Sequence, residues 1–258
     1  MIGQELIFGL HAVTAALRYE PASVQELWVD RQRQDARMRA LLEEAQRGGV
    51  IVHLTARAEL DRLTHRARHQ GVVARRAGRD GSASVRGELN LAELVAAVQG
   101  PPLLLALDGV QDPHNLGACL RSADAAGVHA VIAPADRAVG LTPAVRKVAC
   151  GAAEAVPFVP VTNLARVLRW LQAQRVWVVG AAGEADISLY EMDFTGPVAI
   201  VLGAEEQGLR RLTRELCDYL VRIPMAGHVA SLNVSVAAGV FLFEAVRQRD
   251  RHRVRTSK

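Results

Sequence analysis

The sequence predicts an α/β protein whose larger, C-terminal part contains a mostly parallel sheet covered by helices on both faces. In that part, continuous apolar runs of strand length alternate with amphipathic helical segments, a pattern typical of parallel sheets that are buried on both sides. Polar residues directly follow three of the apolar runs. Because loops at the carboxyl ends of the strands build the ligand site of an open α/β sheet, we expect these three loops to form one site.

The sequence pattern of residues 1–77 predicts a separate, small α/β unit. Apolar residues recur at helical spacing in Gly9–Arg18, and Ala36–Arg47 is an amphipathic segment rich in Arg and Glu that ends at a pair of glycines. Short apolar runs predict strands at Glu26–Asp30, Val50–Leu54 and His69–Arg76.

The chain beyond residue 77 divides into a linker, a second domain and a tail. Residues 78–88 are polar and rich in Gly and Ser, which predicts a flexible linker. Residues 89–249 form the second domain, from a helix over Leu91–Val98 to a last helix from Leu232 to about Arg249, and residues 250–258 are a basic tail. The predicted strands of this domain are Leu103–Val110, His129–Ala133, Ala155–Pro160, Val176–Gly180, Val198–Leu202 and Tyr219–Ile223.

Composition narrows the class of protein. At 258 residues, half of them apolar, the chain can bury a sizeable core. No apolar run approaches the length of a membrane span and the first residues lack a secretory signal pattern, so we expect a soluble, cytoplasmic protein. Cys119, Cys150 and Cys217 form no Cys-x-x-Cys pair, which argues against a zinc site or a disulfide framework. We expect all three cysteines to be small buried side chains.

The net charge of +4 is unevenly distributed along the chain. Residues 1–78 carry 12 basic and 9 acidic side chains, residues 79–246 carry 13 and 17, and residues 247–258 carry 6 and 1. Of the 31 cationic side chains, 29 are arginine. The arginine fork suits phosphate, although the base composition of the source genome gives the same bias.

Four familiar signatures are absent. Gly203 and Gly208 have the glycine spacing of a phosphate-binding loop, but Leu209 and Arg210 stand where that loop needs Lys and Ser or Thr. No Gly-x-Gly-x-x-Gly follows the first strand of the second domain, which excludes the dinucleotide-binding fingerprint. Ser231 lacks the Gly-x-Ser-x-Gly context of a hydrolase nucleophile, and the eight histidines show no metal-binding spacing.

The stretch from Ile223 to Gly239 predicts a strand end, a loop and a helix start. Unpaired N–H groups and a partial positive charge at a helix N-terminus can hold a carboxylate, a phosphate or a nucleoside. On local grounds alone, the better explanation is that Ser231 or Asn233 is only the N-cap of that helix.

Three ordered stretches, Asp112–Asp124, Leu202–Gly208 and Ile223–Ser235, resemble the three motifs of the SpoU (TrmH-type) 2′-O-methyltransferases of the SPOUT superfamily. Gly9–Val13 and His69-Gln70-Gly71 resemble the extra N-terminal RNA-binding domain found in this family. Over the whole chain, the resemblance is greatest to the bacterial 23S rRNA guanosine 2′-O-methyltransferases, which modify the P-loop of the peptidyl-transferase centre.

The resemblance implies an architecture and a set of partners. The C-terminal domain is expected to form a deep trefoil knot, one of the rare exceptions to ordinary chain connections, and to bind S-adenosyl-L-methionine in a bent shape. The N-terminal domain is expected to resemble ribosomal protein L30e. The implied substrate is 23S rRNA or a precursor of the large ribosomal subunit, and the implied assembly is a homodimer whose site is completed across the interface. The reaction requires no metal.

The resemblance also implies roles for individual residues. Backbone groups of Gly203, Ile223 and Leu232 are expected to line the S-adenosyl-L-methionine pocket. Arg121 is expected to act on the 2′-hydroxyl group. The residues expected around it are Asn115, Glu205, Ser231 and Asn233.

Because an arginine is protonated at all ordinary pH values, we expect Arg121 to bind the adjacent phosphate and stabilise alkoxide charge, and Glu205 to orient the hydroxyl or accept its proton. Each residue also has a structural interpretation. In that interpretation Asn115 is a helix cap, Arg121 a solvated charge or a partner of Asp124, and Glu205 a charge at a helix N-terminus.

Other arginines and other functions stay open. Arg75, Arg76 and the arginines of the tail are either contacts to rRNA phosphates or ordinary solubilising charges. A tRNA 2′-O-methyltransferase on the same scaffold is one alternative function. A non-catalytic RNA-binding or ribosome-assembly factor is another, and it predicts RNA affinity without cofactor affinity.

Overall fold

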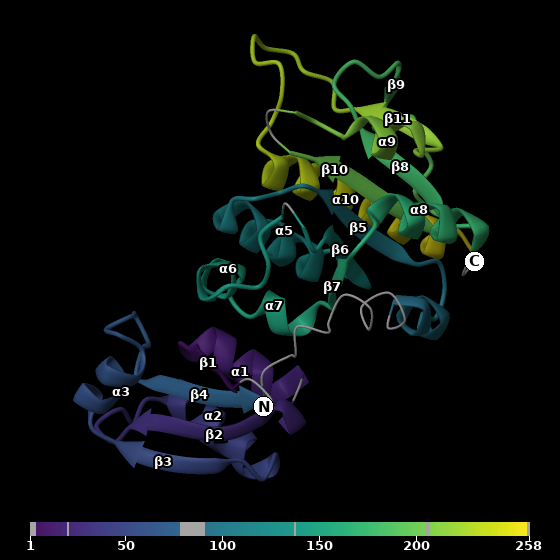
Figure 1. The fold of residues 1–258 in the computed structure, drawn as a ribbon. Helices are drawn as coiled ribbons and strands as arrows, with labels where there is room; N and C mark the ends of the chain where they lie inside the picture. The colour runs from purple at the N-terminus through teal and green to yellow at the C-terminus, as the bar shows by residue number, and fades with distance from the viewer. Residues whose placement is uncertain (1–3, 20, 78–90, 137, 205–206, 257–258) are drawn as a thin grey trace.

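The computed structural model describes residues 4–19, 21–77, 91–136, 138–204 and 207–256, which form two β-sheets with their helices (Figure 1). The first sheet lies within residues 4–77 and the second within residues 103–222. The predicted linker at residues 78–88 lies outside the described residues. Within the described part of the chain, no helix combines the length and the apolar character needed to cross a membrane.

The N-terminal sheet has four strands in the order β1-β4-β2-β3. β4 pairs antiparallel with both β1 and β2, whereas β2 and β3 are parallel. Leu27 and Val29 of β2 pack on one side of the sheet with Met38 and Leu41 of α2. The elements are β1 (Gln4–Phe8), α1 (Leu10–Tyr19), a 3-10 turn (Pro21–Ser23), β2 (Val24–Asp30), α2 (Ala36–Arg47), β3 (Ile51–Thr55), α3 (Arg57–Leu63) and β4 (Val72–Ala77). β1 was not predicted from the sequence.

The C-terminal sheet has seven strands in the order β7-β6-β5-β10-β8-β11-β9, and every neighbouring pair is parallel. Its strands are β5 (Leu103–Asp108), β6 (Ala130–Pro134), β7 (Phe158–Val161), β8 (Trp177–Ala181), β9 (Ile187–Ser188), β10 (Val198–Gly203) and β11 (Tyr219–Arg222). Its helices are residues 91–97, α5 (Pro113–Ala125), α6 (Pro143–Ala149), α7 (Ala152–Ala155), α8 (Leu164–Ala173), α9 (Arg211–Glu215) and α10 (Val234–Thr256).

Helices cover both faces of this sheet, which confirms the prediction. On one face, Leu116 of α5 and Phe241 of α10 belong to a buried cluster with Leu105 of β5. On the other face, Leu168 of α8 packs in a second cluster with Leu104 of the same strand. The strand is fully buried along its length, as its uninterrupted apolar sequence predicts.

Two predicted boundaries in the C-terminal part are wrong. Ala155, the first residue of the predicted strand Ala155–Pro160, is instead the last residue of the helical turn α7, and the strand starts at Phe158. The last helix does not end near Arg249 but continues to Thr256, through most of the predicted tail. The guanidinium of Arg249 donates hydrogen bonds to the backbone carbonyls of Pro101, Pro102, Phe194 and Gly196, which anchors the helix at this point.

The two parts of the chain meet where α1 lies against α7 (Figure 1). Gly151 precedes α7 with a positive φ of 99°, a conformation that glycine adopts without strain. A Cβ atom at this position would lie 3.0 Å from Cβ of Ala15 and 3.1 Å from the carbonyl oxygen of His11. The absence of a side chain therefore allows close approach of the two parts.

Candidate cofactor and catalytic site

A cavity of about 370 Å³ lies at the carboxyl ends of β8, β10 and β11. Gly203 ends β10, Ile223 follows β11, and Leu232 lies two residues before α10, and all three line this cavity. Ser231 lines it as well and is exposed. Since parallel strands place their carboxyl ends at the same edge of the sheet, segments about 30 residues apart in the sequence contribute to one wall.

The loop that follows β10 closes tightly on itself. Ala204 and Gly208 form an isolated antiparallel bridge, in which the backbone N–H of Gly208 donates to the carbonyl of Ala204 at 2.8 Å. A Cβ atom on Gly203 would lie only 2.0 Å from the carbonyl carbon of Gly208. Glycine is therefore required at position 203. Glu205, within this loop, lies outside the described residues.

A side-chain hydrogen bond joins two of the predicted site residues across 118 positions of sequence. Nδ2 of Asn233 donates to Oδ1 of Asn115 at 3.0 Å. Oδ1 of Asn233 accepts from the backbone N–H of Ser235 at 2.9 Å, so Asn233 also caps the start of α10. The cap of α5 is Asp112, which accepts from the backbone N–H groups of residues 114 and 115. The structural interpretation of Asn115 as a cap is therefore wrong.

Arg121 lies on α5 but on another side of the helix from Asn115. The two residues are six positions apart, which places them about 120° apart around the helix axis. The side chain of Arg121 is exposed, and its Nη1 lies 3.9 Å from Sγ of Cys150. Cys150 is exposed, which corrects the prediction that all three cysteines are buried. Its backbone caps α6 in a left-handed conformation, which turns the thiol outward.

The sequence interpretation missed an ion pair at the rim of the cavity. Glu184 and Arg214 both line the cavity and pair with each other. A hydrogen bond from its own backbone N–H, followed by the contact with Arg214, holds the pKa of Glu184 below its ordinary value. The two residues are 30 positions apart and belong to no recognisable motif, so the sequence contains no signal that pairs them.

The arginines that were considered as phosphate contacts occupy different environments. Arg76 is 2% exposed and cannot reach a phosphate without leaving the N-terminal core. Arg75 pairs with Glu26 at 2.8 Å and lies over the ring of Trp28. Arg249 is engaged by backbone carbonyls, and burial lowers its pKa. Arg76 and Arg249 therefore serve the fold, which corrects the expectation for Arg76, whereas Arg249 precedes the predicted tail.

No group of three or more His, Cys, Asp or Glu side chains is arranged to hold a metal ion within the part of the chain that the structure describes. The polar groups that the described residues bring to the cavity include backbone N–H and C=O groups of its loops, the Glu184–Arg214 pair, the side chains of Gln207 and Arg222 and the hydroxyl of Ser231. Such a lining suits a small organic ligand that combines an apolar body with charged and polar groups.

Two family profiles match this chain. The profile of the SpoU rRNA methylase family matches residues 102–243, and that of the RNA 2′-O ribose methyltransferase substrate-binding domain matches residues 6–78. The first contains every residue that lines the cavity. The second covers the sheet of the N-terminal part.

Among curated relatives, the chain is 58% identical over 250 residues to the 23S rRNA (guanosine-2′-O-)-methyltransferase RlmB of Pseudomonas syringae pv. tomato, covering 96% of this chain and 98% of that one. Among solved structures, the SpoU methyltransferase AviRb from Streptomyces viridochromogenes in complex with AdoMet is similar with a TM-score of 0.78 and 29% identity, over 96% of this chain and 92% of that one. The TrmH/SpoU tRNA modifying enzyme of A. aeolicus has a TM-score of 0.53 at 30% identity, and covers 65% of this chain and 86% of its own.

Proposed function

Because this chain belongs to the SpoU rRNA methylase family, we propose that it transfers a methyl group from S-adenosyl-L-methionine to the ribose 2′-hydroxyl of a guanosine in 23S rRNA. Relatives whose names state this activity match nearly the whole chain. The structural observation that carries the proposal is the single cavity lined by Gly203, Ile223 and Leu232. In this proposal the target guanosine lies in the peptidyl-transferase P-loop, which the motif resemblance supports.

The cavity fits S-adenosyl-L-methionine in size and lining. Its volume of about 370 Å³ lies within the range of sites for small organic ligands. Phe241, Val234 and Leu209 provide apolar surface, and the closed 203–208 loop leaves backbone groups at the wall. The similar AviRb structure contains AdoMet, which supports the same cofactor here.

When bound, the cofactor supplies an electrophilic methyl group together with its leaving group. The residues of this chain have to hold the ribose oxygen in line with that methyl group and lower the cost of removing the hydroxyl proton. The Asn115–Asn233 hydrogen bond supports this positioning role, because it ties the loop that carries Ser231 and Leu232 to α5, the helix of Arg121.

Arg121 is assigned to charge stabilisation. A guanidinium donates hydrogen bonds but does not accept a proton in a protein. Its exposed position on α5 leaves it accessible to RNA. In this proposal it binds the phosphate next to the target ribose and stabilises the negative charge that develops on the 2′-oxygen. Glu205 accepts the proton, and its neighbours Ala204 and Gln207 line the cavity, which supports this assignment.

The finer architecture forms part of the same proposal. Residues 1–77 act as an L30e-like substrate-binding domain and residues 89–249 as the methyltransferase domain, supported by the two profile matches. A deep trefoil knot is proposed for the C-terminal segment, because the loop before α10 borders the cavity and α10 packs on α5 and β10. A cytoplasmic homodimer is proposed, and the exposed Val236 and Phe243 on α10 support a subunit interface there.

The proposal is tested by incubating the purified protein with S-adenosyl-L-methionine and unmodified 23S rRNA and mapping new 2′-O-methyl groups. Arg121→Ala and Glu205→Gln are assayed beside Arg169→Ala, a control that removes an exposed arginine on α8. We expect one new methylguanosine, at least a 100-fold loss of rate in Arg121→Ala, and full activity in the control. The pH–rate profile of the wild type should lose its acidic limb in Glu205→Gln.

Each contrary outcome identifies the part of the proposal that fails. An unchanged pH profile in Glu205→Gln would remove that residue as the proton acceptor. Methylation of tRNA instead of rRNA would favour the tRNA enzyme, which the partial coverage by the A. aeolicus protein disfavours. RNA binding without any binding of S-adenosyl-L-methionine would favour a non-catalytic assembly factor.

A further inference from the structure

One cavity near the N-terminal sheet is lined mainly by charged side chains. It has a volume of about 790 Å³ and lies between the start of α1, the β2–α2 connection, α3 and the loop that leads into β4. We call it the basic cleft, because two aspartates, Asp30 and Asp61, are outnumbered there by arginines. The arginines of the basic cleft are Arg33, Arg37, Arg57, Arg66 and Arg68.

The floor of the basic cleft is fixed by His69. This side chain is 2% exposed, and its Nδ1 accepts a hydrogen bond from the backbone N–H of Gly71 at 3.0 Å. The proton of the neutral ring is therefore on Nε2, which lies 3.0 Å from Oδ1 of Asp61 on α3 and donates to it. His69 thus links the turn before β4 to α3.

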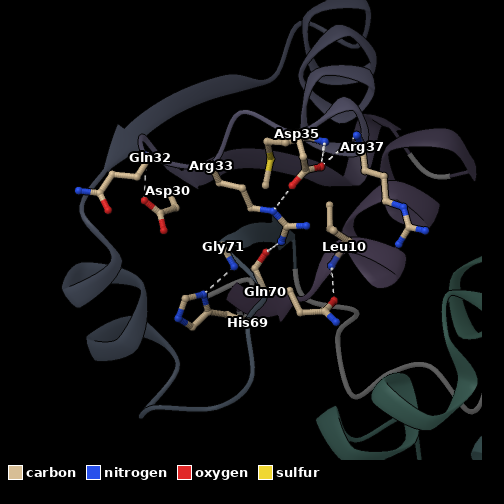
Figure 2. Close-up of polar contacts among 10 residues, drawn as sticks. Leu10, Asp30, Gln32, Arg33, Asp35, Arg37, His69, Gln70 and Gly71 are labelled. Atoms are coloured by element: carbon tan, nitrogen blue, oxygen red, sulfur yellow. Dashed lines mark hydrogen bonds and ion pairs between the residues drawn. The ribbon is translucent and has the colours of Figure 1, made fainter.

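Gln70 links the same turn to two further segments (Figure 2). Its Oε1 accepts from the backbone N–H of Leu10, at the start of α1, and its carbonyl accepts from Nη1 of Arg33 in the β2–α2 connection. Arg33 in turn donates from Nε to Asp35, the cap of α2, and lowers the pKa of that carboxyl group. The cleft is therefore a built and connected site rather than a chance group of surface charges.

The loop between α3 and β4 holds its backbone in unfavourable conformations. His65, Arg66 and Gln70 have positive φ values of 50°, 62° and 50°. Non-glycine residues in this region cost of order 1 kcal/mol or more each and concentrate at functional sites. Here the strained loop brings Arg66 and Arg68 to the wall of the cleft.

Most of the cleft arginines have no carboxylate partner. In the described part of the chain, Arg37, Arg57, Arg66 and Arg68 are exposed and form no ion pair, whereas Arg62, on the outer side of α3, pairs with Glu59. Unneutralised guanidinium groups around a concave surface attract phosphate, to which they bind bidentately, and they also stack on bases. A recess of this size accommodates an unpaired nucleotide, whereas the backbone of an RNA duplex presents a convex surface.

The basic cleft leads toward the proposed catalytic arginine. A second cavity of about 360 Å³, between α1 and the helices α5 to α7, shares Leu10, His11 and Arg37 with the cleft. This second cavity extends to Cys150, whose Sγ is 3.9 Å from Arg121. Two adjoining hollows therefore connect the cleft of the N-terminal part to the helix that carries Arg121.

We propose that the basic cleft binds an unpaired nucleotide of the substrate RNA together with its flanking phosphates, on the same strand as the methylated ribose. This inference rests on the proposed function for the identity of the RNA. In this proposal, single-stranded RNA is bound by Arg37, Arg57, Arg66 and Arg68, which surround the His69-Gln70-Gly71 floor. The outer face of α2 takes no part in RNA binding.

The test compares two double variants that remove the same charge. Arg66→Ala/Arg68→Ala removes two arginine side chains from the wall of the cleft, whereas Arg39→Ala/Arg47→Ala removes two exposed arginines of α2 that do not line it. Binding of each protein to a hairpin RNA that carries the target guanosine in its loop is measured over a series of salt concentrations, without cofactor. Thermal unfolding confirms that each variant is folded.

We expect the cleft variant to bind the hairpin at least 10-fold more weakly and the slope of log affinity against log salt to fall by about 1.4, the value for two contacts to single-stranded phosphates. The α2 control should stay within 2-fold of the wild type. When the loop is paired to a complementary strand, the wild type should lose affinity to the level of the cleft variant.

Equal losses in the two variants, or an unchanged preference for the unpaired loop in the cleft variant, would overturn the inference. Arg66→Lys/Arg68→Lys should recover the salt slope but only part of the affinity, because lysine restores charge without the planar fork. Since the measurement is binding, it separates the two proposals. A protein that binds through the cleft but never methylates the hairpin contradicts the proposed function and leaves this inference standing.

Discussion

The two cavities to which ligands are assigned in this protein, the cofactor cavity and the basic cleft, differ in what forms their walls. The cofactor cavity is bounded by closed backbone loops and small or apolar residues, such as Gly203 and Leu232. The basic cleft, about twice as large, is bounded by long charged side chains, of which Arg66 and Arg68 lie on a strained loop. A ligand of fixed size and shape is held by backbone groups that cannot move, whereas a flexible polyanion is held by mobile charges.

This difference predicts opposite sensitivities. The cofactor cavity should be damaged by the addition of one carbon atom and be indifferent to salt. The basic cleft should tolerate changes of shape and respond to the loss of charge. The three predictions below are ordered from the largest expected effect to the smallest.

The largest effect is expected from Gly203→Ala. The new Cβ would lie 2.0 Å from the backbone of Gly208, so the 203–208 loop has to open. We expect the affinity for S-adenosyl-L-methionine, measured by titration calorimetry, to fall by about 100-fold or more at any salt concentration. Gly183→Ala is the matched control, because it lines the same cavity with its nearest atom 3.8 Å away. Similar affinities for both variants would show that the loop is not rigid.

A smaller effect is expected from Arg249→Ala, which separates a structural arginine from the RNA-binding arginines. Its guanidinium bonds four backbone carbonyls, two before β5 and two before β10. Its loss should lower the free energy of unfolding, measured by denaturant titration, by about 2 kcal/mol. The salt slope of RNA binding should not change. Arg251→Ala, an exposed neighbour on the same helix, should leave the free energy of unfolding unchanged, and destabilisation of equal size there would contradict the assignment.

The smallest effect concerns the chemical reactivity of two cysteines, Cys217 and Cys150. Burial, reinforced by the charges of Asp218 and Asp108, raises the pKa of Cys217 to about 12. At pH 8 only on the order of one Cys217 in 10,000 is a thiolate, so the native protein should not be alkylated there. Exposed Cys150, in the hollow between the two parts, should react with iodoacetamide. Peptide mass spectrometry measures both sites, and comparable rates would show that the C-terminal sheet opens readily.

Much of the fold follows from local pattern. Ala36–Arg47 is a helix with the bounds that its apolar spacing predicts, and the apolar run at Leu103 is the buried central strand β5. Errors arise where packing overrides local preference. The last helix continues beyond Arg249, whose side chain is engaged by distant carbonyls, and Arg76, in a strand that looks basic, is buried.

The sequence by itself determined the class of fold, the alternation of strands and helices and the three motifs, because each depends on residues close together in the chain. Only the tertiary structure decided which side chains meet. It joined Asn115 to Asn233, paired Glu184 with Arg214, and assembled the basic cleft from four separate segments. These contacts depend on how parallel strands and their loops are arranged in space. The spacing of residues along the sequence does not show that arrangement.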